Sequence, residues 1–120
     1  MEKINVIEKL NLFSDHWNPK IIGELNGQQV KLVKFLGDFI WHHHDNEDEM
    51  FFVLKGKFKM EFRDKIIEIG EQEMLIVPRG VEHRSSAAEE VWVMVFEPKS
   101  TINTGNVSND LTKNILERLV

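Results

Sequence analysis

Short apolar stretches, separated by turn residues, run through most of the chain. Gly, Asn and Asp residues interrupt these stretches at regular intervals, and this pattern is typical of an all-β sandwich or barrel. We expect strands at residues 21–25, 29–36, 39–44, 49–54, 57–62, 65–69, 74–77 and 91–96. The sequence therefore predicts an all-β fold.

Helical spacing of apolar residues occurs near the two ends of the chain. Residues 5–13 carry apolar side chains at intervals of three and four, which predicts a short amphipathic helix. Residues 101–109 are rich in Ser, Thr, Asn and Gly, and we expect them to be irregular. After them, Asp110 could cap a last short helix over residues 111–119, which carries one apolar stripe.

Two of the expected strands are apolar on both faces, namely residues 50–54 and 91–96. A half-buried antiparallel strand should alternate apolar and polar residues. One face of these strands can fill the barrel, but the other would leave an apolar patch that soluble monomers avoid. The N-terminal helix is too short to cover all of it. We therefore expect a homodimer, because a two-fold axis is the commonest way for a chain to cover such a surface with a second copy.

Composition limits the class of protein. A chain of 120 residues is expected to form one domain. It has no Cys, so any metal must be held by nitrogen and oxygen atoms. The net charge of −5 and the dispersed Lys and Arg residues argue against a nucleic-acid partner. The sequence shows no secretory signal and no apolar run of membrane-spanning length, so we expect a cytoplasmic protein with no membrane partner.

The densest cluster of candidate ligands lies in residues 41–49, Trp-His-His-His-Asp-Asn-Glu-Asp-Glu. Side chains alternate across a strand, so His42 and His44 should share one face while His43 points to the other. Residues 45–48 let the chain turn, after which Glu49 can face the same interior. Asp48 would be the alternative ligand if that turn were one residue tighter.

A fourth candidate ligand, His83, comes from a distant part of the chain, after the turn set by Pro78 and Gly80. An ionised Glu buried without a partner costs several kcal/mol, and a divalent ion or a proton has to offset this cost. We therefore expect one divalent metal ion bound by His42, His44, Glu49 and His83. We expect the three Trp residues to lie in the core, and His16 to be a structural or surface residue. Three charged residues near His83 could place charges at the mouth of a pocket: Arg79, Glu82 and Arg84.

At these residues the chain resembles the cupin superfamily. The first cupin motif is matched by Gly37, His42, His44, Glu49 and Gly56, and the second by Gly70, Pro78, Gly80 and His83. The Asn that often follows the last His is missing, because Ser86 and Ala87 occupy that region. Within the superfamily, the chain looks most like the small single-domain cupins labelled mannose-6-phosphate-isomerase-like.

The resemblance implies the cupin double-stranded β-helix, a jelly-roll barrel. It covers about residues 20–98, so residues 1–19 and 99–120 should pack on the barrel as terminal segments of the same domain, 1–120. Cupins often pair in the way expected above, which supports the predicted homodimer.

The charge of the expected site favours one kind of ligand. Three neutral imidazoles and one carboxylate around a divalent cation leave a net charge of +1, and four protein ligands leave two positions open on an octahedral ion. Such a site attracts a small, oxygen-rich, anionic chelator: a carboxylate beside a hydroxyl or carbonyl, a vicinal diol or a sugar phosphate. Fe, Mn, Ni, Zn, Co and Cu all suit these ligands.

The sequence thus predicts a metal-binding protein that takes up a small oxygen-rich molecule. If it is an enzyme, two chemistries lead: dioxygenation at Fe(II), and metal-assisted isomerisation or decarboxylation. The isomerase interpretation needs a general base besides the ligands, and none is identifiable. Two alternatives stay open, namely a non-catalytic binding or sensing domain and a structural homo-oligomer with a vestigial site.

Overall fold

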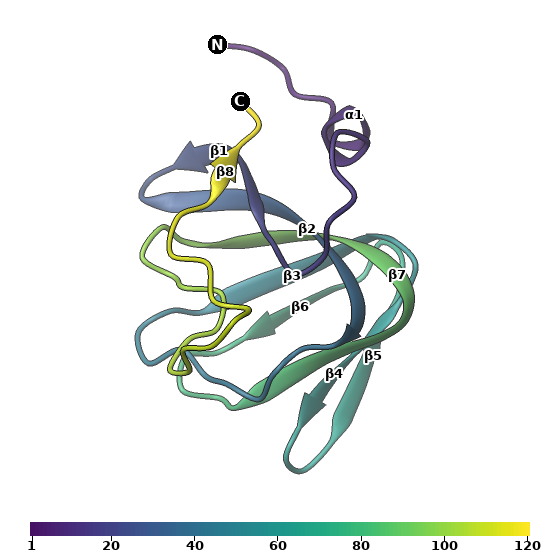
Figure 1. Cartoon of the computed structure of the whole chain (residues 1–120), viewed down its shortest axis with the longest axis vertical. Helices are drawn as coiled ribbons and strands as arrows, with labels where there is room; N and C mark the ends of the chain where they lie inside the picture. The colour runs from purple at the N-terminus through teal and green to yellow at the C-terminus, as the bar shows by residue number, and fades with distance from the viewer.

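The structure, a computed structural model, describes residues 1–120 and shows a jelly-roll barrel with one short helix (Figure 1). It confirms the all-β fold predicted from the sequence. The elements are α1 (Val6–Leu10), β1 (Lys20–Leu25), β2 (Gln28–Asp38), β3 (Glu49–Lys55), β4 (Phe58–Phe62), β5 (Ile66–Ile69), β6 (Met74–Val77), β7 (His83–Pro98) and β8 (Glu117–Arg118).

The long strand β7 organises the barrel. Its first part pairs with β4, while its second part lies between β2 and β3, antiparallel to both. In Figure 1 it curves around the molecule as one continuous green ribbon. The remaining strands extend this arrangement outward, with β1 on β2, β5 on β4 and β6 on β3. The strand β7 therefore places buried residues from both of its ends, such as His83 and Glu97, in the interior of the barrel.

Alternation along the strands builds the core. In β3, every second side chain from Glu49 to Val53 is buried, and the residues between them are half-buried. In β7 the same alternation runs from Val91 to Glu97. The main core is apolar and includes Val33, Phe35, Phe51, Phe58 and Val93. Polar residues enter it only near the ends of these strands, where the candidate site lies.

A second, smaller apolar cluster covers part of the outer face of the sheet. Leu10 of α1 is fully buried there against Ile22 and Leu32. The helix begins at Asn5, whose side chain accepts a hydrogen bond from the Glu8 backbone N–H at 3.0 Å. The expected N-terminal helix is therefore confirmed, although it is shorter than the predicted range 5–13.

Two predicted elements are wrong. Residues 39–44 do not form a strand, and within them only His42 makes an isolated bridge, to His83. The helix expected over residues 111–119 is absent. Instead β8 pairs in parallel with β1, and Leu119 packs in the smaller cluster beside Leu10. Pairing of this segment with the barrel replaces the local helical hydrogen bonds that its apolar spacing suggested.

No helix is long and apolar enough to cross a bilayer.

Candidate metal centre

The candidate centre forms where residues 39–48 cross the start of β7. His42 and His83 exchange two backbone hydrogen bonds, at 3.0 Å from the His42 N–H and 2.9 Å from the His83 N–H. A further backbone bond joins the Gly80 N–H to the His44 carbonyl at 2.7 Å. The turn at Pro78 and Gly80 is therefore fastened to the His-rich segment, which brings the distant His83 beside the other imidazoles.

The structure brings together the four residues predicted as metal ligands. One ligand atom from each of them lies within 4.8 Å of the others. Their exposed fractions are only 4% for His42, 4% for His44, 5% for Glu49 and 1% for His83. His43 points away from them, with its side chain 29% exposed and its Nε2 3.0 Å from Asp45. The predicted alternation of faces therefore holds, even though the segment is no regular strand.

Backbone carbonyls orient two of the imidazoles. The Nδ1 atom of His42 lies 2.8 Å from the Ile40 carbonyl oxygen, and that of His83 lies 2.8 Å from the Val81 carbonyl oxygen. A carbonyl oxygen only accepts, so each Nδ1 carries the hydrogen and each neutral ring keeps a free lone pair on Nε2. This is how metal-binding histidines are usually held by their surroundings.

Burial and charge tune the ionisation of these groups. Burial, followed by the charge of His83, lowers the pKa of His42 from 6.5 to about 4, which keeps this ring neutral near pH 7. Burial alone would raise the pKa of Glu49. The His44 and His83 rings beside Glu49, each of which donates a hydrogen bond to the carboxylate when it is protonated at Nε2, outweigh burial and hold that pKa well below its ordinary value. Glu49 is therefore a carboxylate, the form that binds a cation.

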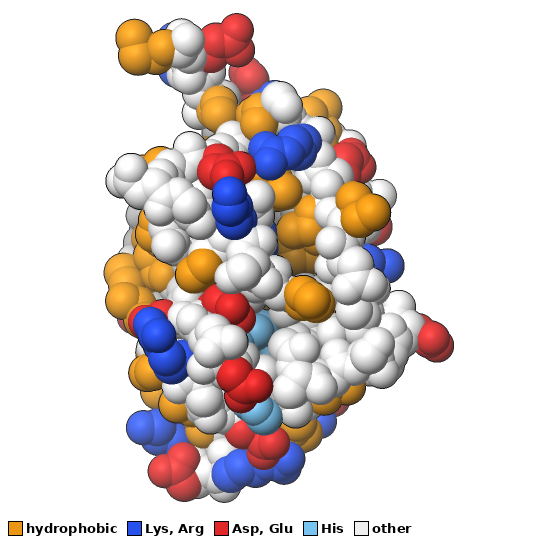
Figure 2. Space-filling model, turned by 90° about the vertical axis from the view of Figure 1, so that its left-hand side faces the viewer, with side chains coloured by type: hydrophobic (Ala, Val, Ile, Leu, Met, Phe, Trp, Pro, Cys, Tyr) orange, Lys and Arg blue, Asp and Glu red, His pale blue; other side chains and the backbone are white.

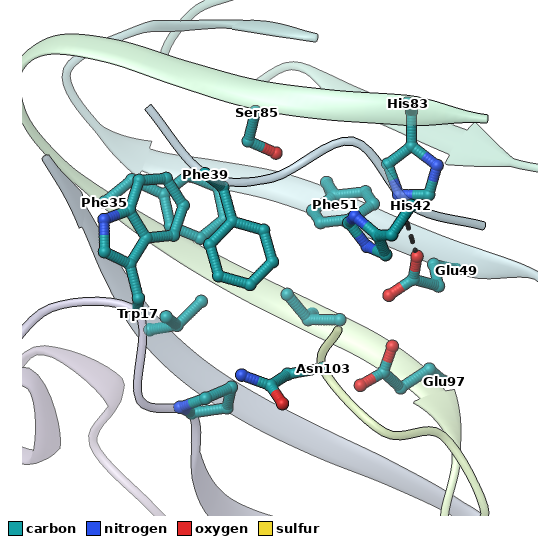
Figure 3. Close-up of a pocket in the computed structure, with 13 residues that line it drawn as sticks. Trp17, Phe35, Phe39, His42, Glu49, Phe51, His83, Ser85, Glu97 and Asn103 are labelled. Atoms are coloured by element: carbon teal, nitrogen blue, oxygen red, sulfur yellow. Dashed lines mark ion pairs between the residues drawn. The ribbon is translucent and has the colours of Figure 1, made fainter. Parts of the chain in front are cut away.

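Three buried polar atoms of the centre fit a cation. Glu49 Oε1 lies 2.9 Å from His44 Nε2 and 3.3 Å from His83 Nε2, and none of the three has a hydrogen-bond partner when the imidazoles are neutral. The dashed line in Figure 3 marks the contact between Glu49 and His83. Lone pairs would then face one another across these short distances. A proton on a ring would relieve this for one contact, but a divalent ion relieves it for all three atoms. The residues present therefore fit a metal ion.

Other predicted site residues lie outside the centre. Asp48, the alternative ligand, instead pairs with Arg79: it accepts from the Arg79 backbone N–H at 2.8 Å and lies 3.2 Å from the guanidinium. Arg84 pairs with Glu61 at 3.0 Å on neighbouring strands, and Glu82 pairs with Arg63. These charges are paired with each other, so they are not free to meet a ligand at the pocket mouth.

A buried ion pair beside the centre was missed from the sequence. Lys31 of β2 donates from Nζ to Glu97 Oε1 at 2.7 Å, and both side chains are buried. Burial, followed by the negative charge of Glu49, raises the pKa of Glu97 well above its ordinary value. A signal was present: both residues occupy inward positions next to apolar inward residues of the same strands, Val33 in β2 and Val95 in β7.

The C-terminal segment also contributes to the site. Asn106 holds His43 by two bonds, one from its backbone N–H to the His43 carbonyl at 3.0 Å and one from the His43 N–H to its Oδ1 at 2.9 Å. Gly105 packs so closely here that a Cβ would lie 2.1 Å from the His43 carbonyl oxygen. Asn103 of the same segment lines the pocket. The Ser/Thr/Asn/Gly-rich composition predicted irregular structure but gave no sign of these contacts.

A pocket opens beside the candidate ligands. It has a volume of about 50 Å³, and Figure 3 shows an aromatic side formed by Trp17, Phe35 and Phe39 and a polar side formed by His42, Glu49, His83 and Glu97. Trp17 stacks on Phe35 and Phe39 with ring centroids 4.5 and 4.8 Å away. Figure 2 shows a His side chain visible between surrounding atoms on one face of the molecule, with acidic side chains beside it.

Known proteins share this fold and its central sequence. A cupin-2 domain containing protein from Shewanella frigidimarina NCIMB 400 is 45% identical, and its crystal structure matches with a TM-score of 0.79 over 80% of this chain and 94% of that one. Protein NMB1881 from Neisseria meningitidis is 34% identical, with a TM-score of 0.75 over 82% of this chain and 100% of that one.

A third relative is matched only in part. The uncharacterized protein YdbB of Bacillus subtilis (strain 168) is 38% identical over 65 residues, which span 53% of this chain and 58% of that protein. The family model described as a cupin domain matches residues 33–97, more than half of the chain and including all four candidate ligands. The chain belongs to the cupin domain family.

Proposed function

We propose that His42, His44, Glu49 and His83 hold one divalent metal ion, and that this ion binds a small oxygen-rich molecule in the adjacent pocket. The observation that carries the proposal is the set of three buried atoms that lack a donor, His44 Nε2, Glu49 Oε1 and His83 Nε2. When bound, the metal would supply Lewis-acid chemistry by lowering the pKa of a coordinated hydroxyl or water. Nitrogen and oxygen ligands of this kind suit Fe, Mn, Ni, Zn, Co or Cu.

Metal analysis of protein purified without a His-affinity step tests the first half of this proposal. We expect about one divalent ion per chain, removable by a chelator and restored by adding Co(II). Protein that neither carries a metal nor takes up Co(II) after chelation would contradict it and leave the vestigial-site interpretation.

A thermal-shift screen of organic acids and polyols on the metal-loaded protein tests the second half. A ligand that binds only the folded state raises the unfolding temperature. Turnover of a stabilising ligand would then distinguish an oxygenase or isomerase from a non-catalytic binding or sensing domain. The finer likeness to mannose-6-phosphate-isomerase-like cupins and the cytoplasmic location stay predictions from the sequence.

We also propose that two copies pair through the outer face of β3 and β6. Met74 and Ile76 of β6 are 51% and 54% exposed. They lie opposite Phe52 and Met50 of β3 in the antiparallel register, so the four side chains share one face. The helix α1 covers another part of the sheet, beside Leu32, and leaves these residues uncovered. A second copy meeting this apolar face across a two-fold axis would bury it.

A further inference from the structure

A row of aromatic rings joins the apolar end of the pocket to the candidate metal centre. The Phe39 ring lies between the other two, with its centroid 4.8 Å from that of Trp17 and 5.4 Å from that of His42. All three residues line the pocket, and Figure 3 shows Trp17 and His42 on opposite sides of Phe39. The indole therefore stands at the end of the pocket away from the candidate ligands, only one ring removed from them.

Trp17 is fixed in a conformation that bulky residues rarely adopt. Its φ is 57°, in the left-handed region. Two hydrogen bonds to β2 keep it there, from its backbone N–H to the Lys34 carbonyl at 3.0 Å and from Nε1 to the Leu36 carbonyl at 2.9 Å. The polar group of the indole is thereby used, so the ring offers apolar surface to the pocket. Backbone strain of this kind clusters at ligand-binding sites.

The position of Trp17 in the sequence separates it from the metal centre. It lies in the connection between α1 and β1, outside the residues 33–97 that the cupin domain model matches, whereas all four candidate ligands lie inside that range. A residue on a connecting segment can change the shape of a pocket without moving ligands that the barrel holds. Trp17 is therefore placed to select ligands independently of metal binding.

The space between the indole and the candidate ligands is small. The pocket volume of about 50 Å³ has room for about four water molecules, each of which needs roughly 10–15 Å³. Bonded atoms lie closer together than separate waters, so a ligand of about five or six non-hydrogen atoms fills the same volume. A hexose has about twice that number of atoms and does not fit, and its phosphate is larger still.

The chemistry of the wall adds a second restriction. Phe35 and Phe39 stack on Trp17 with ring centroids 4.5 and 4.8 Å away, and Val33 lines the pocket beside them. A hydroxyl group buried against these side chains loses its bonds to water and finds no partner, which is costly. A methyl or methylene group is instead favoured there, because it leaves water. The part of the ligand that faces Trp17 is therefore an alkyl group.

We propose that Trp17 is a specificity-determining residue that sets the maximum length of the ligand. The ligand class that follows is a small chelating acid of roughly two or three carbons, with its oxygen atoms at the metal and its alkyl end toward Phe39 and Trp17. The inference rests on the proposed metal site. Sugars and sugar phosphates are excluded by their size and by their hydroxyl groups.

Calorimetric titration of the Co(II)-loaded protein tests this inference, with the Co(II) absorption spectrum as a second readout. Three probes share one chelating head and differ only in chain length, namely glycolate, lactate and 2-hydroxyhexanoate, and glucose 6-phosphate represents the sugar phosphates. We expect lactate to bind at least about tenfold more tightly than 2-hydroxyhexanoate, because even one methylene group that does not fit changes affinity by about this factor. Glucose 6-phosphate should bind more weakly than lactate.

Variants of Trp17 assign the length limit to this residue. Trp17→Gly removes the indole, and Gly adopts a positive φ without strain. It should keep Co(II) and reduce the preference for lactate over 2-hydroxyhexanoate at least about tenfold. Trp17→Asn, which also tolerates this φ, opens the same space and gives the test if the Gly variant does not fold.

Two further variants control for loss of stability. Trp17→Phe retains an aromatic ring in the wall and should keep most of the preference for lactate. Trp92→Ala removes a different indole, one that packs in the smaller cluster on the outer face, and should leave the preference unchanged. A purely structural role of Trp17 would instead lower the stability of its variants and leave the ratio of the two affinities as it is in the wild-type protein.

The outcomes separate this inference from the proposed metal site. Failure of the wild-type protein to bind Co(II) would overturn the metal site itself. Binding of Co(II) together with equal or tighter binding of 2-hydroxyhexanoate or glucose 6-phosphate, or with no binding of any probe, would overturn the inference alone. A folded Trp17→Gly or Trp17→Asn variant that still prefers lactate as strongly as the wild-type protein would show that another residue limits the ligand.

Discussion

The inner and outer faces of β3 and β7 differ in what completes them. On the inner face, Glu49 and Phe51 of β3 and Val95 and Glu97 of β7 meet other residues of the same chain. On the outer face of β3, Phe52 lies beside partly exposed residues of β6. The inner face is therefore filled by the chain itself except at the candidate metal centre and its pocket, whereas the outer face is covered only in part by α1. Regular alternation of side chains produces both faces. The inner face carries polar candidate ligands, whereas the outer face carries apolar side chains.

The largest expected difference between the faces is in packing. Phe51→Ala would open a cavity in the main core and should lower the free energy of unfolding by about 4 kcal/mol. Phe52→Ala, the neighbouring residue on the outer face, should cost about 1 kcal/mol, because its side chain is only half-buried. Urea denaturation of the two variants, metal-free and at low concentration, measures both. Equal losses would mean that the outer face is as tightly packed as the core.

The second test compares the two sides of the His-rich segment. His44→Ala removes a buried candidate ligand and should weaken Co(II) binding at least 100-fold, about 3 kcal/mol. His43→Ala alters a half-exposed ring that contacts Asp45 and should change the affinity less than threefold. Competition with a calibrated chelator gives the two constants. A greater loss in the His43 variant would show that the ligands lie on the other face.

How much of this centre the sequence predicts depends on the distance over which each signal acts. Alternation is local, so it correctly separates His42 and His44 from His43. Alternation also places Lys31 and Glu97 on the inward faces of their strands. Their pairing across 66 positions of sequence, however, depends on which strands become neighbours. The positive φ of Trp17 has no sequence signature, since bulky residues rarely adopt it.

The C-terminal segment shows the limit of periodicity. Residues 111–119 have helical spacing, yet Leu119 packs in the cluster beside Leu10 because β8 pairs with β1 instead. A short helix is marginal on its own, so tertiary contacts decide its conformation. The close approach of Gly105 to His43 likewise exists only once the barrel has formed. The fold class and the four candidate ligands were therefore predictable from the sequence. The conformation of residues 101–119 and their contacts with the barrel were not.

The third test uses the pH dependence of the metal-free protein. The pKa of His42 is about 4 in the folded protein and 6.5 ordinarily, so the unfolded chain takes up this proton first as the pH falls. The resulting stability is fully present above about pH 6.5 and is lost progressively toward pH 4. Between pH 7 and pH 5 the loss from this group should be about 2 kcal/mol.

Comparison of variants isolates this effect, because the raised pKa of Glu97 acts in the opposite direction over the same range. His42→Leu should lack the part of the pH dependence that His42 provides, while His43→Leu should keep it. Urea denaturation of the wild-type protein and the two variants at pH 7 and pH 5, in the presence of a chelator, gives the three differences needed. An unchanged pH dependence in the His42 variant would contradict the assignment.

The smallest expected effect concerns the outer face alone. Ile76→Lys places a charge at a residue that is 54% exposed on the face shared with Met50, so it should barely alter the stability of one chain. If two copies pair there, each would bury a Lys in an apolar interface, and dimer dissociation should increase at least tenfold. Light scattering at micromolar concentration should give about twice 14.1 kDa for the wild-type protein and a mass nearer one chain for the variant.

Ile66→Lys, at an exposed residue of β5 away from this face, is the control and should leave the mass unchanged. A wild-type mass near one chain would mean that the apolar outer face of β3 and β6 stays uncovered, and the contrast with the inner face would then be one of packing only.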